Sequence, residues 1–111
     1  MGKILNENLI FLCDLNDIPE GRGLKVCSEN RRALAVFKHD EGVSVTDEIC
    51  THGYASLAEG EVDGVEVECP LHSGAFNLIT GEPTEAPCSI TLLVHQCVVK
   101  NNKVYLVNND G

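Results

Sequence analysis

The stretch CTHGYASLAEGEVDGVEVECPLHSGAF, residues 50–76, carries two cysteine–histidine pairs. One residue separates the first pair and two residues separate the second, and sixteen residues lie between the pairs. Each pair sets a soft thiolate beside an imidazole on a short turn, which suits zinc or iron–sulfur chemistry better than calcium or magnesium. The pattern therefore predicts a single metal site with four ligands: Cys50, His52, Cys69 and His72.

Two kinds of centre take two cysteines and two histidines. One is a closed tetrahedral zinc site, but zinc knuckles usually pair Cys with Cys and His with His on each turn. Here each turn carries one of each. That mixture fits a [2Fe-2S] cluster in which one iron takes both cysteines and the other takes both histidines. The sequence favours the cluster, and a zinc-stabilised interaction module stays as the alternative.

The pattern of β-favouring residues indicates the fold class. The chain has 111 residues, enough for one domain. Apolar runs of strand length alternate with turn residues, and no long helix-period pattern occurs. The expected strands lie within residues 9–13, 23–28, 33–38, 42–46, 65–69, 89–100 and 103–107. Asp63-Gly64 and Asn101-Asn102 predict tight hairpin turns, and residues 55–60 a brief helical turn. The sequence therefore predicts an all-β domain of antiparallel hairpins.

Charge and cysteine content limit the partners and the compartment. Acidic residues outnumber basic residues 17 to 8, for a formal net charge of −9. Nucleic acid and anionic membrane surfaces are therefore not expected partners, whereas a basic patch on another protein is. The N-terminal residues lack a long apolar segment followed by a small-residue cleavage site, so we expect no secretory signal, and no apolar run approaches the roughly 20 residues of a membrane-spanning helix. We expect a cytoplasmic protein whose cysteines serve metal binding rather than a disulfide framework.

Residues 50–83 resemble the cluster-binding region of Rieske proteins, whose motif is Cys-x-His followed by Cys-x2-His. More narrowly, CTHGYASL, GAFN and TGEP…APC are similar to the small Rieske ferredoxins of bacterial aromatic-ring-hydroxylating dioxygenases, especially the carbazole-type angular dioxygenases. The resemblance implies one Rieske domain over residues 1–111, an antiparallel β-sandwich with a small cluster-binding subdomain of two loops at about residues 45–85. It also implies that the two cysteines hold the inner iron and the two histidines the outer one.

The same resemblance implies a function. The chain is expected to be a one-electron carrier rather than an enzyme, and to act as a monomer. Electrons are expected to come from an NAD(P)H-dependent flavin protein, the ferredoxin reductase, and to pass to the terminal oxygenase. A small Rieske subunit of another oxidoreductase, such as a nitrite reductase, is the alternative function.

Two departures from high-potential Rieske proteins bear on the reduction potential. Ala55 and Leu71 stand where those relatives carry a disulfide, and Gly74 and Phe76 stand where they carry hydroxyl groups that bond to the cluster. Hydrogen bonds to sulfur stabilise the reduced cluster. We therefore expect a potential toward the lower end of the Rieske range of about −150 to +300 mV.

The other cysteines and histidines have plainer interpretations. Three cysteines inside β-runs are expected in the core: Cys13, Cys27 and Cys97. Cys88 is expected to pack in a loop beside the cluster. His39 is expected to be an exposed turn residue, and His95 a partly buried histidine with a polar partner.

Overall fold

The computed structural model describes residues 9–27, 33–50, 55–70, 74–86, 88 and 90–107. Within these ranges the chain forms eleven strands and two 3-10 helices. The strands are β1 (Leu9–Asp14), β2 (Gly23–Val26), β3 (Leu34–His39), β4 (Gly42–Asp47), β5 (Val62–Asp63), β6 (Glu66–Glu68), β7 (Ala75–Asn77), β8 (Pro83–Glu85), β9 (Val94–His95), β10 (Cys97–Lys100) and β11 (Lys103–Val107). The short helices are η1 (Leu15–Asp17) and η2 (Leu57–Glu59). Neither helix has the length and apolar character needed to cross a bilayer.

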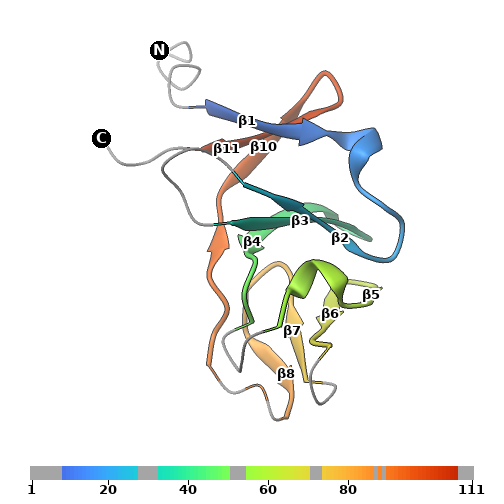
Figure 1. Cartoon of the computed structure of the whole chain (residues 1–111), viewed down its shortest axis with the longest axis vertical. Coiled ribbons are helices and arrows are strands. Elements are labelled where there is room, and N and C mark those ends of the chain that lie inside the picture. Colours follow the sequence, from blue (N-terminus) through green and yellow to red (C-terminus); the bar gives the residue numbers. More distant parts are fainter. Residues whose placement is uncertain are drawn as a thin grey trace.

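The strands form three antiparallel sheets, which Figure 1 shows one below another. The uppermost sheet has the order β1-β11-β10, the middle sheet β2-β3-β4-β9, and the lowest sheet β5-β6-β7-β8. The lowest sheet lies between β4 and β9 in the sequence, and η2 lies over it. The prediction of an all-β antiparallel chain is confirmed.

Strand β3 is buried on both faces and joins two hydrophobic cores. Successive side chains of a strand point to opposite faces of its sheet. Leu34 and Val36 therefore enter one core, which we call the first core, and Ala35 and Phe37 enter the other, the second core. This double burial explains why residues 33–38 are an almost unbroken apolar run rather than an alternating one.

The two cores divide the chain. The first core lies between the upper and middle sheets, with Leu12, Cys13, Ile18, Leu34, Val36, Val45, Val104 and Leu106. The second core lies between the middle and lowest sheets, with Ala35, Phe37, Cys50, Ala55, Leu57, Ala58, Val67, Cys69, Phe76, Leu78, Cys88 and Leu92. Three of its twelve residues are cysteines, and two of these are predicted metal ligands.

The hairpin turns depend on residues that tolerate positive φ. Asn101 and Asn102, with φ of 54° and 65°, connect β10 to β11 as predicted, which is the requirement of a type I′ turn. The β5–β6 turn lies one residue later than predicted, because Asp63 pairs with Glu66 and leaves Gly64 and the following valine as the loop. Gly64 has φ of 65°, so it must take the first loop position.

The prediction for residues 89–100 was wrong in part. Only β9 and β10 are strands, and residues 90–93 run outside them. Leu92 donates its N–H to the carbonyl of Gly81 at 2.7 Å, and Leu93 accepts the N–H of Asp47 at 3.4 Å, so this segment connects a loop of the lowest sheet to the end of β4. The helical turn predicted at residues 55–60 is confirmed as η2, and η1 was not predicted.

The three core cysteines of the sequence prediction have different outcomes. Cys13 is buried in the first core, and Cys97 is half-buried against it. Cys27 is exposed, so its prediction was wrong. The reason is that β2 ends at Val26, which forms the last pair of the β2–β3 ladder with Leu34, so Cys27 lies beyond the paired strands.

Replacing Phe37 by Ala is expected to lower the free energy of unfolding by about 3–5 kcal/mol, because its ring is fully buried in the second core. The matched control is Phe11→Ala. Phe11 is 52% exposed, and its ring contacts the edge of Tyr105 and lies 5.9 Å from Lys103 Nζ, so its loss is expected to cost about 1 kcal/mol. Chemical denaturation followed by circular dichroism measures both. Equal losses in the two variants would contradict the two-core packing.

Candidate metal centre

The first cysteine–histidine turn follows the end of β4 and is closed by backbone hydrogen bonds. The N–H of Cys50 donates to the carbonyl of Ala55 at 2.9 Å, and the N–H of Leu57 donates to Glu48 at 2.8 Å. Ile49 and Ser56 form an isolated antiparallel bridge between these bonds. Residues 48–50, just after β4, therefore pair with residues 55–57, and Cys50 lies at the end of this pairing. His52 lies between the two paired segments in the sequence, outside the described residues.

The second turn has the same closure. Strands β6 and β7 pair up to Glu68 and Ala75, and the N–H of Cys69 then donates to the carbonyl of Gly74 at 2.5 Å. In both turns the cysteine N–H therefore bonds the carbonyl five residues later. His72 lies inside the second loop and also outside the described residues. Both cysteines therefore occupy the same position relative to the hydrogen bond that closes their turn.

The two loops bring their cysteines together. Cys50 and Cys69 are 3% and 1% exposed, and their Sγ atoms lie within 4.8 Å of each other and of Cys88 Sγ. All three are members of the second core, together with Phe76 and Leu92. The three sulfur atoms are thus buried side by side in apolar surroundings, although they come from three separate segments of the chain.

Cys88 packs beside the two predicted ligand cysteines, in the segment after β8. It is 5% exposed, so the predicted packing role holds, but its Sγ also lies beside both predicted ligand sulfurs. Burial raises the pKa of the Cys88 thiol. The contact with Cys50 lowers this pKa in part, whereas the contact with Cys69 raises it further. No spacing motif links position 88 to the Cys-His turns, because the contact is made only when the segment after β8 folds back on them.

Gly74 is needed for this contact. A Cβ at position 74 would lie 2.3 Å from Cys88 Sγ and 3.1 Å from Cys88 N, closer than real side chains come. Gly74 is not among the described residues with positive φ, so its role is close approach and not an unusual backbone conformation. The backbone of the second cysteine turn at Gly74 therefore packs directly against the thiol of Cys88.

The chemistry of these groups fits an iron–sulfur cluster. Two thiol groups converge from two loops of equal size, and thiolate is the donor that iron–sulfur clusters and zinc prefer. The surrounding second core excludes water, and burial of this kind controls the potential of a redox centre. The cysteines present therefore suit a redox group held between the two turns.

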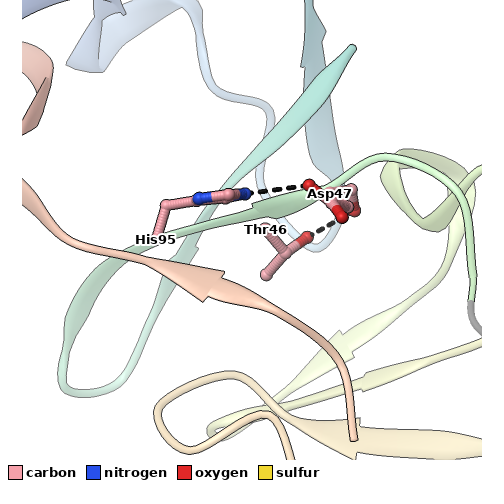
Figure 2. A network of polar contacts seen from close by, with 3 residues as sticks. All are labelled: Thr46, Asp47 and His95. Carbon is pink, nitrogen blue, oxygen red and sulfur yellow. Dashed lines mark hydrogen bonds and ion pairs between the residues drawn. The ribbon is translucent and has the colours of Figure 1, made fainter. Parts of the chain in front are cut away.

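Polar contacts among Thr46, Asp47 and His95 lie at the base of the first turn, as Figure 2 shows. His95 Nε2 lies 2.8 Å from Asp47 Oδ1, and Thr46 Oγ1 donates to the carbonyl of Asp47 at 2.8 Å. Both side chains of the pair are about one-fifth exposed, at 22% and 21%. The predicted environment of His95 is confirmed. The contact joins β9 to the last residue of β4, three positions before the first predicted ligand.

His39 differs from its prediction. It is half-buried at the end of β3, its Nε2 lies 2.8 Å from Ser44 Oγ, and its Nδ1 accepts the N–H of Glu41 at 3.1 Å. Burial lowers its pKa, which outweighs the opposing charges of Asp40 and Glu41. The expected exposed turn residue is therefore a hydrogen-bonded residue of the β3–β4 hairpin.

The lowest sheet presents a strongly acidic surface. A hollow of about 220 Å³ is lined by one alanine, Ala75, and by five carboxylates: Glu61, Asp63, Glu66, Glu68 and Glu85. Glu68 and Ala75 form the pair next to the second cysteine turn. We call these five carboxylates the acidic hollow. It places a concentration of negative charge beside one of the two loops.

Comparison with known proteins places the site in a family context. Residues 8–103 match the model of the Rieske [2Fe-2S] domain. The chain is 38% identical to ferredoxin CarAc of Metapseudomonas resinovorans over 92% of this chain and 95% of that one. The family match replaces the zinc alternative of the sequence analysis.

Solved structures agree in fold. The Sphingomonas yanoikuyae B1 ferredoxin has a TM-score of 0.84 and 36% identity, covering 91% of this chain and 99% of its own. A ferredoxin-length chain in the complex of reduced oxygenase and oxidized ferredoxin in carbazole 1,9a-dioxygenase has a TM-score of 0.81 and 38% identity, covering 92% and 94%. The predicted fold class is confirmed by these similarities.

Replacing Gly74 by Ala is expected to lower the free energy of unfolding by about 1–3 kcal/mol, because the new Cβ would overlap Cys88 Sγ. The double variant G74A/C88A should recover part of this loss, because alanine has no sulfur at that place. Thermal melting of both single variants and the double variant gives the coupling between the positions. Losses that simply add would contradict the contact.

Proposed function

This chain belongs to the Rieske [2Fe-2S] domain family, and from that membership we propose that it is a ferredoxin, a one-electron carrier of an aromatic-ring-hydroxylating dioxygenase system. It carries electrons from an NAD(P)H-dependent flavin reductase to the terminal oxygenase and has no substrate turnover of its own. The convergence of Cys50 and Cys69 from two equivalent loops is the structural observation that carries the proposal.

The four predicted ligands are part of the proposal. Cys50 and Cys69 bind the inner iron of a Rieske-type [2Fe-2S] cluster, and His52 and His72 bind the outer iron. When bound, this cluster stores and releases a single electron. The two closing hydrogen bonds support the assignment, because they orient each cysteine toward the second core while each histidine belongs to the loop beyond it.

The same reasoning extends to the domain and its surroundings. Residues 1–111 form a single Rieske domain, with a cluster-binding subdomain at about residues 45–85. The chain is a monomer and works in the cytoplasm. The match to the Rieske [2Fe-2S] domain explains cysteines in this chain by metal binding rather than by disulfides, which suits a reducing compartment.

The partners meet the chain partly through charge. The chain has a net charge of −9, and five of its carboxylates are gathered in the acidic hollow beside the second cysteine turn. Opposite charge on a partner increases the association rate more than the affinity. A basic surface on the reductase or the oxygenase therefore brings the cluster loops close to the partner's redox group.

The dithionite-reduced protein is expected to give the rhombic EPR signal of a Rieske cluster, with two iron atoms and two acid-labile sulfides per chain. Cys50→Ala or Cys69→Ala is expected to abolish this signal, because each removes one inner-iron ligand. Cys27→Ala is the control, since that thiol is exposed and away from the second core. One zinc per chain without labile sulfide would overturn the proposed function.

Reconstitution tests the partners. Purified reductase and oxygenase of a dioxygenase system are expected to consume oxygen in a substrate-dependent reaction only when this chain is added. Neutralising the acidic hollow in E61Q/E66Q should lower the association rate severalfold and weaken its salt dependence.

The control D17N/E41Q removes the same number of charges outside the acidic hollow and should leave the rate unchanged. Activity with a nitrite reductase but not with an oxygenase would favour the alternative function instead. An equal effect of the two double variants would show that net charge, rather than the acidic hollow, steers the encounter.

A further inference from the structure

Three buried sulfur atoms meet in the second core, but the proposed cluster uses only two cysteines. Cys88 is 5% exposed, and its Sγ lies within 4.8 Å of Cys50 Sγ and Cys69 Sγ. It comes from the segment between β8 and β9, so neither Cys-His turn supplies it. A buried thiol beside two ligand sulfurs therefore has no role in the function described so far.

We infer that Cys88 is a positioning residue whose S–H group donates a hydrogen bond to one of the two ligand sulfurs and thereby raises the reduction potential. The inference rests on the proposed function, because it needs Cys50 and Cys69 as cluster ligands. Cys88 stays a thiol throughout, so no bond forms or breaks at its sulfur and the single electron remains on the cluster.

The backbone around Cys88 holds the thiol in place. The N–H of Cys88 donates to the carbonyl of Glu85 at 3.2 Å, which ties the residue to the end of β8. On the other side Cys88 Sγ lies against Gly74, where a Cβ would come within 2.3 Å of it. Leu92 and Phe76 belong to the second core, as Cys88 does. The sulfur is thus confined between the second cysteine turn and apolar side chains.

The direction of the effect follows from electrostatics. A thiol is a weak hydrogen-bond donor, and a metal-bound thiolate is an acceptor that becomes more negative when the cluster is reduced. Low dielectric in a buried site strengthens such a bond. The bond therefore stabilises the reduced state more than the oxidised state. The Cys88 hydrogen bond therefore raises the potential. The absence of hydroxyl groups at Gly74 and Phe76 lowers it, so the two effects oppose each other.

Four variants separate a hydrogen bond from simple packing. Cys88→Ser keeps a donor, Cys88→Ala removes it, and Cys88→Val removes it while filling more of the space. The control is Cys13→Ala, which removes another thiol that is 5% exposed but belongs to the first core. Protein-film voltammetry of each cluster-loaded variant measures the reduction potential.

The expected result is a shift of the reduction equilibrium about tenfold toward the oxidised state in both Cys88→Ala and Cys88→Val. For a one-electron couple this is about 59 mV lower. Cys88→Ser should keep most of the wild-type value, and Cys13→Ala all of it. Unchanged potentials in the alanine and valine variants would overturn the inference. A higher potential in the alanine variant would do so too, because it would indicate water entry instead of a lost donor.

A second measurement uses the wild-type protein alone. The infrared difference between its reduced and oxidised states should contain an S–H stretching band that moves to lower frequency on reduction, since the bond to sulfur strengthens. The absence of any S–H change would contradict the inference. So would folded Cys88 variants that all fail to hold the cluster, because Cys88 would then be a ligand.

The outcomes distinguish the two proposals. If the reduced wild-type protein gives the rhombic EPR signal but the Cys88 variants keep its potential, only the role of Cys88 is wrong. If the wild-type protein gives no such signal, the proposed function fails and the role of Cys88 fails with it.

Discussion

The meeting of three cysteine sulfur atoms in an apolar core is the constraint on which the lower half of this protein depends. Cys50, Cys69 and Cys88 come from the end of β4, the end of β6 and the segment after β8. These three segments must therefore approach one another closely enough for their sulfur atoms to meet. The two closing hydrogen bonds at the first two cysteines and the missing side chain at Gly74 make this geometry possible.

The rest of the fold supports this point through one strand. Strand β3 sends alternate side chains into the two cores. Val36 packs in the first core and the next residue, Phe37, packs in the second, so a single strand connects the packing above and below the middle sheet. The hydrogen bond between Asp47 and His95 then joins β9 to the end of β4, where the first loop begins. A site built from loops is in this way held by paired strands, which suits a carrier whose redox group must keep its geometry in both oxidation states.

The family comparison and the structure contribute different parts of the functional conclusion. The match to the Rieske [2Fe-2S] domain and the similarity to ferredoxin CarAc identify the kind of redox group and the kind of protein. The structure adds the surroundings of the two cysteines proposed to hold that group: an apolar core that includes Phe76, and an acidic hollow beside the second cysteine turn. Burial acts on the potential, and surface charge acts on the encounter with a partner.

Local patterns in the sequence were sufficient for much of this description. The alternation of apolar residues, the Asn101-Asn102 turn and the Cys-x-His and Cys-x2-His spacings depend on residues close together in the chain, and they predicted the all-β class and the ligand set. Only tertiary structure decided the environments of Cys27, exposed beyond the end of β2, and of Cys88, buried beside two other thiols. The physical reason is that burial and sulfur contacts arise from segments far apart in the sequence, whose approach depends on packing and on a single missing Cβ at Gly74.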